Sequence, residues 1–409
     1  MQKIGREKQH RFIPYPHGEA EIERDGAAMH IRLSYGGAYG MGEKYDFFNQ
    51  KGNTVVNRVE EKFCFQGEKT YCAAPFFWTD TGFGLYVDSC ETTSFSFGEG
   101  EISVTLPEEA EVILFTGSPE EIVREYMGLF GKAALPPDWA FEPWISANRW
   151  NTQAEAEEQL NKLIKYDFPA GVIVLEAWSD EATFYIWNGA KYTPVPDGGA
   201  MRCEDFDFSS SPWPDPKGMI DRFHKAGLHL LPVYKKQGGD EALNAQNELD
   251  REHAAAEKLC VMNRDGTPYT IPEGHWFSGS MVPDFTNART VRDWFGKRQY
   301  LLDMGVDGFK TDGGEFIYRE DVAFADGTDG KTGINRYSRD YTASYKAFVG
   351  ENRILFSRAG FAGQHLLPLH WAGDQQSRNG ELKSVLRAGL SAAVSGILFW
   401  GFDIAGFAG

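Results

Sequence analysis

The first third of the chain carries short runs in which apolar and polar residues alternate, the pattern of strands with one buried face. Within 28–135 these runs, separated by Gly, Asp and Glu turns, include 29–33, 83–87, 92–97, 102–106 and 111–115. Their spacing predicts an antiparallel β-sandwich. A helix predicted over Pro119–Phe130, with Ser118 as N-cap, follows the last run, and Pro136 and Pro137 mark a boundary. We therefore assign residues 1–135 to an N-terminal β-sandwich domain.

Beyond this boundary, apolar runs alternate with longer amphipathic runs. The apolar runs, predicted to be strands, are Phe141–Ser146, Gly171–Glu176, Leu228–Tyr234, Val306–Thr311, Ile354–Ser357, Leu367–Trp371 and Ile397–Phe402. The amphipathic runs, predicted to be helices, are Gln153–Tyr166, Lys217–Ala226, Val291–Met304, Arg339–Asn352 and Glu381–Val394. This alternation is typical of a parallel sheet covered by helices, and seven strands fit a (β/α)8 TIM barrel better than an open sheet.

The predicted barrel, residues 136–409, departs from a plain one. The segment 236–287 is too long for a loop and predicts an inserted subdomain. A closed barrel of this type needs eight strands, whereas the chain ends at Gly409 just past the seventh. We therefore expect an incomplete barrel, truncated or completed by a missing segment or a partner, because an open edge would leave a strand unpaired.

Composition narrows the classes of function. The formal charge of -18 argues against nucleic-acid binding and against anionic membrane surfaces, since both require basic patches. Five cysteines without CxxC spacing and nine histidines without an HExxH cluster lead us to expect no metal and no cofactor. Residues 1–21 lack a signal-peptide core, and no apolar span reaches about 18 residues, so we predict a cytoplasmic protein. The oligomeric state stays open, a homo-oligomer included.

Four acidic residues stand where predicted strands end: Glu176, Asp312, Asp374 and Asp403. Each alone is more simply a turn former or a helix cap. In a β/α barrel, however, the C-terminal ends of the strands share one mouth, so four acids predict a pocket lined by carboxylates. Paired carboxylates without a metal motif suit glycoside hydrolysis, in which one attacks the sugar and the other protonates the leaving oxygen.

Other residues near the predicted mouth could bind a sugar. Arg358 follows a strand and offers a fixed cation that would keep a nucleophile ionised and bind hydroxyl groups. Sugar rings also stack on aromatic faces, and the candidates for this are Trp144, Trp178, Trp276 and Trp371. Packing of the barrel explains each of these tryptophans as well. Likewise, an aromatic-rich β core is the simpler explanation of the 14% aromatic content.

Three stretches carry a family resemblance: Lys310-Thr311-Asp312-Gly313-Gly314-Glu315, Arg358-Ala359-Gly360-Phe361-Ala362-Gly363-Gln364 with His370-Trp371-Ala372-Gly373-Asp374, and Phe402-Asp403-Ile404-Ala405-Gly406-Phe407. They resemble, in this order, the nucleophile motif, the acid/base segment and the substrate-binding loop of glycoside hydrolase family 31, the retaining α-glucosidases and α-xylosidases. Shorter matches lie at 39–46, 74–88, 136–140 and 282–287. The resemblance covers roughly residue 35 to the end.

The resemblance implies hydrolysis of an α-glycoside with retained configuration through a covalent glycosyl-enzyme. It implies that Asp312 is the nucleophile and Asp374 the general acid/base, with carboxyl groups about 5–6 Å apart. It places Arg358, Trp371 and Asp403 against the sugar. Together with the other candidates, the substrate-binding residues that we predict are Glu176, Trp178, Trp276, Lys310, Arg358, His370, Trp371 and Asp403.

The sequence departs from the family pattern near the predicted sugar site. Gly313 replaces an aromatic residue, which removes one wall of the pocket, and Phe402 replaces a His or Ala before Asp403. Trp178 stands where α-glucosidases carry a second acid that grips the sugar. A bulky indole there would disfavour a glucose hydroxymethyl group and suit a xyloside, which is the basis of a xylosidase hypothesis.

Two rival functions remain open. The chain could be an inactive carbohydrate-binding fragment of a truncated gene, because the eighth strand, a further active-site histidine and the C-terminal β domains of the family are missing from it. It could also be an α-glucan lyase, which resembles these hydrolases in its fold and nucleophile but ends the reaction by elimination.

Overall fold

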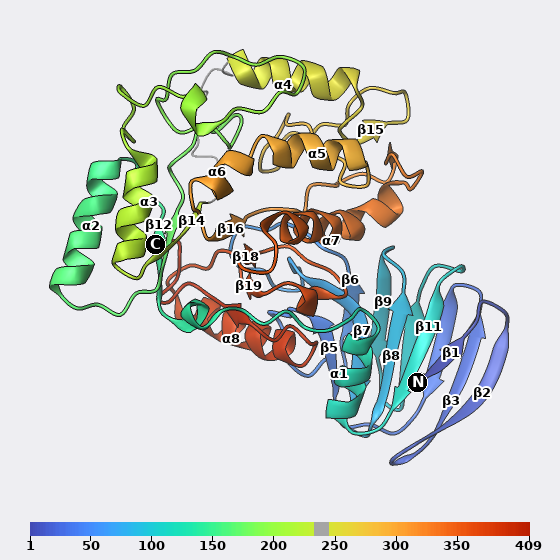
Figure 1. Ribbon diagram of the computed structural model, residues 1–409. Helices are drawn as coiled ribbons and strands as arrows, with labels where there is room; N and C mark the ends of the chain where they lie inside the picture. The colour runs from blue at the N-terminus through green and yellow to red at the C-terminus, as the bar shows by residue number, and fades with distance from the viewer. Residues whose placement is uncertain (233–244) are drawn as a thin grey trace.

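The N-terminal part of the chain forms two antiparallel sheets that pack face to face (Figure 1). The computed structural model describes residues 1–232 and 245–409. One sheet has the order β1 (Gln2–Ile4), β11 (Glu111–Thr116), β8 (Phe83–Asp88), β7 (Ala73–Thr79) and β5 (Ala38–Gly42). The other has the order β2 (Gln9–Tyr15), β3 (Gly18–Asp25), β4 (Ala28–Arg32), β10 (Glu101–Thr105), β9 (Thr93–Phe97) and β6 (Thr54–Asn57). The predicted sandwich is confirmed, and its strands begin earlier than residue 28.

Alternation along the strands produces the core of the sandwich. In β4, Met29 and Ile31 are buried, and they pair across the sheet with Val104 and Ile102 of β10. Strand β7 is different, because all seven of its residues are buried. One of its faces packs into the sandwich core, and the other packs against α1 (Pro119–Gly128). The five-stranded sheet therefore lies between the second sheet and the rest of the molecule.

In the part of the chain that the structure describes, seven strands with parallel pairing follow, which is the number that the sequence predicts. They are β12 (Trp144–Ala147), β13 (Val172–Leu175) and β14 (His229–Pro232) in one sheet, and β16 (Gly308–Thr311), β18 (Ile354–Ser357), β19 (Leu369–Trp371) and β20 (Trp400–Gly401) in another. The backbone N–H of Asp307 donates to Leu230 O over 3.0 Å, which places β16 beside β14. β12 and β20 are the outer strands of this run. The barrel-type fold is confirmed.

Helices cover the strands on the outside (Figure 1). They are α2 (Gln153–Lys165), α3 (Pro216–Lys225), α5 (Ala288–Gly296), α6 (Gln299–Asp303), α7 (Gly330–Val349) and α8 (Asn379–Ala393). In the part of the chain that the structure describes, no helix combines the length and the apolar character needed to cross a membrane.

Several predicted boundaries were wrong, among them that of the strand predicted over Ile397–Phe402, which is only Trp400–Gly401. The helix expected over Val291–Met304 is two helices, α5 and α6, that are broken after Gly296. Helix α7 begins at Gly330 and not at Arg339, because several of its early buried positions are small or polar, such as Gly333, Asn335 and Ser338, and interrupt the apolar period. The strand expected from Phe141 starts only at Trp144, since a short 3-10 helix occupies Asp138–Phe141.

The predicted insertion at 236–287 lies partly outside the described residues, over 236–244. Its described part contains α4 (Ala245–Ala256) and β15 (Met262–Asn263). Strand β15 pairs antiparallel with β17 (Val322–Ala323), which belongs to the loop that follows β16. The status of the segment as a subdomain, and the domain boundary after residue 135, remain predictions.

The sandwich and the barrel meet along α8. Trp78 donates its indole N–H to Val394 O over 2.9 Å, and the backbone N–H of Gly42 donates to Ser395 Oγ over 2.9 Å. The Ser391 hydroxyl donates to Gly42 O over 2.7 Å. Because β5 ends at Gly42, these contacts fix the chain that follows it, 43–45, against the barrel.

Candidate active site

Four residues of the predicted site follow consecutive parallel strands at one end of the barrel. Asp312 follows β16, Arg358 follows β18, Asp374 comes shortly after β19, and Asp403 comes shortly after β20. These strands pair in parallel in the order β16-β18-β19-β20. Since the carboxyl ends of parallel strands lie at one edge, the strand order brings all four residues to the same mouth.

Arg358 is the central cation of this mouth. Its Nη1 lies 3.1 Å from Oδ1 of Asp312, and its Nε and Nη2 donate to the two carboxylate oxygens of Glu315 over 3.1 and 2.8 Å. Arg358 and Glu315 are both buried. Burial alone would lower the pKa of the guanidinium, but the charges of Glu315 and Asp312 outweigh it and raise this pKa. The arginine is therefore a permanent counter-charge for Asp312. The sequence predicted no role for Glu315, although this residue lies in the motif that contains Asp312.

Two aromatic rings hold the guanidinium of Arg358. It lies 4.5 Å from the ring centroid of Tyr71 and 5.2 Å from that of Trp276, within the range of cation–π contacts. The structure thus places Trp276 beside Arg358, and its contact with a sugar stays a prediction, whereas Tyr71 was not predicted. The Tyr71 ring also packs against Gly373, the residue before Asp374. It lies so close that a Cβ at Gly373, whose φ is 67°, would collide with it.

A second buried ion pair links β13 to β16. Nζ of Lys310 lies 3.0 Å from Oε1 of Glu176 and 4.7 Å from the ring centroid of Trp371. Burial opposes the charge on Lys310, but the carboxylates of Glu176, Asp312 and Asp403 outweigh it and raise the pKa of the ammonium group. Lys310 is therefore a second fixed cation among the strand-end acids.

Asp374 differs from Asp312 in its surroundings. Burial raises the pKa of Asp374 to about 6, and the negative charges of Asp312 and Asp403 add to the rise, while Arg358 and Lys310 oppose it. With this pKa, Asp374 is still protonated in a fraction of the molecules near neutral pH. The site therefore contains one carboxylate beside a cation and one carboxyl group that can release a proton.

His370 and Trp178 are the two most deeply buried of the predicted substrate-binding residues. Burial lowers the pKa of His370 to about 4, so its imidazole is neutral near neutral pH, and its Nε2 lies 3.4 Å from Gln364 O. Trp178 is fully buried and packs edge-to-face against Trp187, with ring centroids 4.9 Å apart. The predicted contact of each with a sugar stays a prediction.

Residues that follow β5 of the sandwich contact the barrel strands that carry the site, and the sequence did not predict these contacts. Trp400 donates its indole N–H to Oε1 of Glu43 over 2.6 Å, and the Tyr45 hydroxyl donates to Ala372 O over 2.8 Å. Burial raises the pKa of Glu43 to about 8, so this carboxyl group is mostly protonated at neutral pH. Glu43 and Tyr45 thus hold β20 and the strand end that precedes Asp374.

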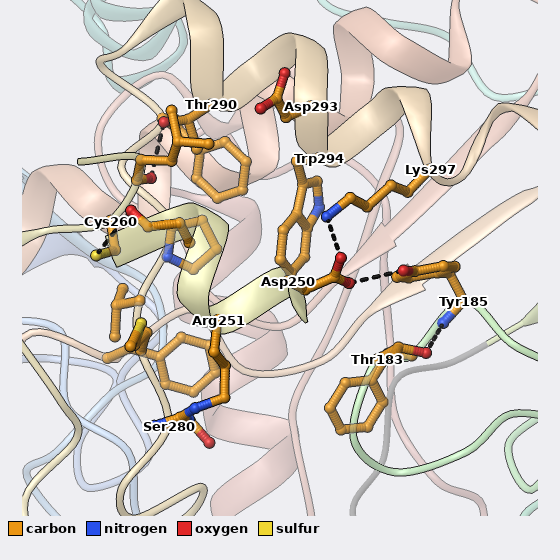
Figure 2. Close-up of a pocket in the computed structure, with 18 of the residues that line it drawn as sticks. Thr183, Tyr185, Asp250, Arg251, Cys260, Ser280, Thr290, Asp293, Trp294 and Lys297 are labelled. Carbon is orange, nitrogen blue, oxygen red and sulfur yellow. Dashed lines mark hydrogen bonds and ion pairs between the residues drawn. The ribbon is translucent and has the colours of Figure 1, made fainter. Parts of the chain in front are cut away.

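A mostly apolar cavity of about 230 Å³ lies beside the nucleophile candidate. Figure 2 shows part of its lining, including Asp250, Trp294 and Lys297. Residues of α4, α5 and α7 line it, and so does Asp312, which follows β16. The carboxylate of Asp250 in its wall accepts hydrogen bonds from Tyr185 and Lys297, both over 2.7 Å. The other strand-end acids, Glu176, Asp374 and Asp403, are not among its lining residues. Of the four acids, the cavity therefore borders Asp312.

The strand-end acids do not form a metal-ligand group. Among the described residues, the groups whose ligand atoms converge closely enough to hold an ion are His224, His229 and Asp307, and His10, Glu21 and Glu23. Neither group includes the acids at the mouth.

Comparison with known families gives two matches. The sequence model of the Glycosyl hydrolases family 31 TIM-barrel domain matches residues 133–409. That of the Glycosyl hydrolase 31 N-terminal galactose mutarotase-like domain matches residues 10–96. The two matches fall on the barrel and on the sandwich, respectively.

Individual relatives carry more specific names. An isomaltosyltransferase of Sporosarcina globispora is 35% identical over 390 residues, which are 91% of this chain and 35% of that protein. A 1,3-alpha-isomaltosidase of Kribbella flavida is 36% identical over 385 residues, 90% of this chain and 53% of that protein. The solved structure of the cycloalternan-forming enzyme from Listeria monocytogenes with a pentasaccharide substrate is similar with a TM-score of 0.89 at 35% identity, covering 95% of this chain and 38% of that one. α-Xylosidases and α-glucosidases match at 28% identity or less. The chain spans between about a third and about half of the length of the first two relatives.

Proposed function

Because the chain belongs to glycoside hydrolase family 31, we propose that it cleaves α-linked glucosides, with Asp312 as nucleophile and Asp374 as general acid/base. One observation carries this proposal. Arg358 lies 3.1 Å from the carboxylate of Asp312, while burial raises the pKa of Asp374 to about 6. Two carboxyl groups in such different surroundings suit the two roles of a retaining glycosidase.

The proposed reaction has two steps. A carboxylate oxygen of Asp312 attacks the anomeric carbon, the bond to the leaving oxygen breaks, and Asp374 gives its proton to that oxygen. The product of this step is a glycosyl ester on Asp312. Asp374, now ionised, takes a proton from an incoming hydroxyl group, whose oxygen attacks the anomeric carbon and releases Asp312. Two inversions at one carbon retain the configuration, and they require carboxyl groups about 5–6 Å apart.

The other residues of the mouth would hold the sugar. We assign hydroxyl recognition to Asp403 and Lys310, which lie close enough for the charge of Asp403 to act on the Lys310 ammonium, and ring stacking to Trp371. Trp178 is buried against Trp187, so its position gives no support to the argument that its indole selects a xyloside.

We propose an isomaltosyl group as the donor unit of the substrate. Two relatives have names that refer to an isomaltosyl group. The isomaltosyltransferase is 35% and the 1,3-alpha-isomaltosidase 36% identical to this chain, compared with 28% for an α-xylosidase. These two names differ in the acceptor that takes the glycosyl group. The second step could therefore use a sugar hydroxyl or water.

A panel of donors tests this assignment. We expect oligosaccharides with a terminal isomaltosyl unit to be cleaved with a higher kcat/KM than p-nitrophenyl α-glucoside, and p-nitrophenyl α-xyloside to be the poorest. Chromatography of the products separates transfer from hydrolysis, and anhydrofructose would reveal a lyase. A preference for the xyloside would overturn the donor assignment. Sugar binding without any turnover would favour the carbohydrate-binding fragment.

The pH dependence tests the role of Asp374. The acid must be protonated in the free enzyme, so kcat/KM is expected to fall as the pH rises through about 6, the raised pKa of Asp374. Above that pH the decline should approach about tenfold per pH unit. In Asp374→Asn this decline should vanish for substrates with an activated leaving group, which need no proton. An alkaline limb that persists in Asp374→Asn would assign it to another group.

A further inference from the structure

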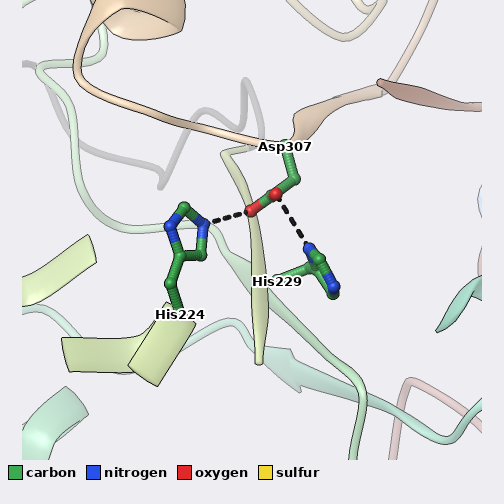
Figure 3. A group of neighbouring side chains, drawn as sticks. All are labelled: His224, His229 and Asp307. Atoms are coloured by element: carbon green, nitrogen blue, oxygen red, sulfur yellow. Dashed lines mark hydrogen bonds and ion pairs between the residues drawn. The ribbon is translucent and has the colours of Figure 1, made fainter. Parts of the chain in front are cut away.

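Two histidines and an aspartate meet where β14 and β16 begin, at the end of the barrel opposite the proposed active site. Figure 3 shows the three side chains. His224 lies in the last turn of α3, His229 is the first residue of β14, and Asp307 directly precedes β16. Since β16 begins after Asp307 and ends before Asp312, the two aspartates are separated by the length of a strand, about 17 Å. The cluster therefore does not belong to the proposed catalytic machinery.

Both imidazoles point at the same carboxylate. Nε2 of His224 lies 2.8 Å from one oxygen of Asp307, and Nδ1 of His229 lies 2.8 Å from the other. The three residues can offer ligand atoms that all lie within 4.8 Å of one another. Two imidazole nitrogens and a carboxylate are ligands that Zn²⁺ binds, with Zn–N and Zn–O distances of about 2.0–2.2 Å. Small side-chain shifts would bring the three groups to these distances.

The surroundings hold two of the three groups in place. The Asp307 carboxylate accepts the backbone N–H of Leu230 over 2.9 Å, and the His229 ring stacks on Trp139 with centroids 4.0 Å apart. Such outer contacts orient the ligands in metal sites. His224 is freer, because 35% of its side chain is exposed. Solvent therefore reaches the cluster on the side of α3.

Charge also favours a cation at this place. In the part of the chain that the structure describes, the side chains that pair with Asp307 are the two histidines, and neither lysine nor arginine neutralises it. The other converging group, His10, Glu21 and Glu23, is less suitable, because Arg32 lies 3.2 Å from Glu21 and 3.0 Å from Glu23. A guanidinium at these carboxylates would repel an incoming metal ion.

We propose that His224, His229 and Asp307 form a site for a divalent transition-metal ion, with Zn²⁺ as its preferred occupant. The ligands are Nε2 of His224, Nδ1 of His229 and the Asp307 carboxylate, and water completes the coordination. On binding, each ring proton now shared with Asp307 moves to the other ring nitrogen. The ion would join α3, β14 and β16 at the N-terminal face of the barrel, where residues serve stability and not catalysis.

Calorimetric titration of the chelator-treated full chain with ZnCl₂ tests the site. We expect one Zn²⁺ per chain and a rise in the melting temperature on binding. His224→Ala should weaken binding by at least about tenfold and abolish the rise, because even the loss of an outer-shell partner costs that much. His10→Ala removes a histidine from the other converging group. It should leave the affinity for Zn²⁺ and the rise in melting temperature unchanged. His224 lies at the exposed end of a helix, so its variant should keep the fold.

The Co²⁺ complex separates this site from adventitious binding. Its absorption should show ligand-field bands without the intense thiolate band that a cysteine ligand would add, and His224→Ala and Asp307→Asn should lose these bands. Failure of the wild-type chain to bind Zn²⁺ or Co²⁺ would overturn the proposal. Equal binding by His224→Ala would do the same. These measurements do not depend on glycosidase activity, so they stand apart from the test of the proposed function.

Discussion

Asp312→Ala is expected to reduce kcat/KM for the preferred donor by at least about 10⁴-fold, the scale of losses when a catalytic nucleophile is removed. Glu315, the other acid that follows the same strand, is not free to take its place, because Arg358 binds both of its carboxylate oxygens. The fold should persist, since Arg358 keeps Glu315 as its partner. Steady-state kinetics and a thermal melt measure the two effects.

A matched control separates this effect from a general change of charge. Asp321→Ala removes an exposed aspartate that pairs with Arg319, and it should leave kcat/KM unchanged. Azide should restore turnover in Asp312→Ala with activated donors by attacking the anomeric carbon directly, which yields a product of inverted configuration. If Asp312→Ala kept about a tenth of the wild-type kcat/KM or more, Asp312 would not be the nucleophile, because such a loss is far below the nucleophile scale.

Arg358→Met is expected to lower the free energy of unfolding by about 3–5 kcal/mol, because it leaves the buried Glu315 and the partly buried Asp312 without their cation. Arg358 is the partner of both Asp312 and Glu315, and its own side chain is only 3% exposed. Methionine fills part of the space between Tyr71 and Trp276 but supplies no charge. Denaturant-induced unfolding of the variant measures the loss.

Two further variants locate the cause of this loss. Arg319→Met removes an exposed ion pair and should cost less than about 1 kcal/mol. Adding Glu315→Gln to Arg358→Met should restore part of the lost stability, since it removes one of the uncompensated charges. A cost for Arg358→Met as small as that for Arg319→Met would show that the buried network contributes little to the fold.

The fold was predictable where the local pattern and the tertiary packing agree. The alternation in 29–33 became β4 because Met29 and Ile31 face the sandwich core. The pattern did not reveal the first turns of α7, since that helix buries Asn335 and Ser338, whose side chains bond to the backbone of distant segments. Buried polar residues of this kind do not contribute to the apolar periodicity from which a helix is predicted.

The candidate site was predictable as far as it is built from strand ends. Asp312, Asp374 and Asp403 each follow an apolar run, and the strand order alone brings them together. Tyr71 and Glu43 could not be found in this way, because they belong to the sandwich domain and reach the site only when α8 packs against β5. Their roles depend on the contact between the two parts of the chain.

Trapping of the covalent intermediate tests the central claim most directly, namely that Asp312 is the nucleophile of a retaining α-glycosidase. The chain is incubated with a fluorinated glycosyl fluoride whose enzyme ester hydrolyses slowly, and the intact protein and its peptides are analysed by mass spectrometry. We predict a mass increase of one fluoroglycosyl group per chain, located on the peptide that contains Asp312. Turnover without such an adduct, or an adduct on another carboxylate, would contradict the account.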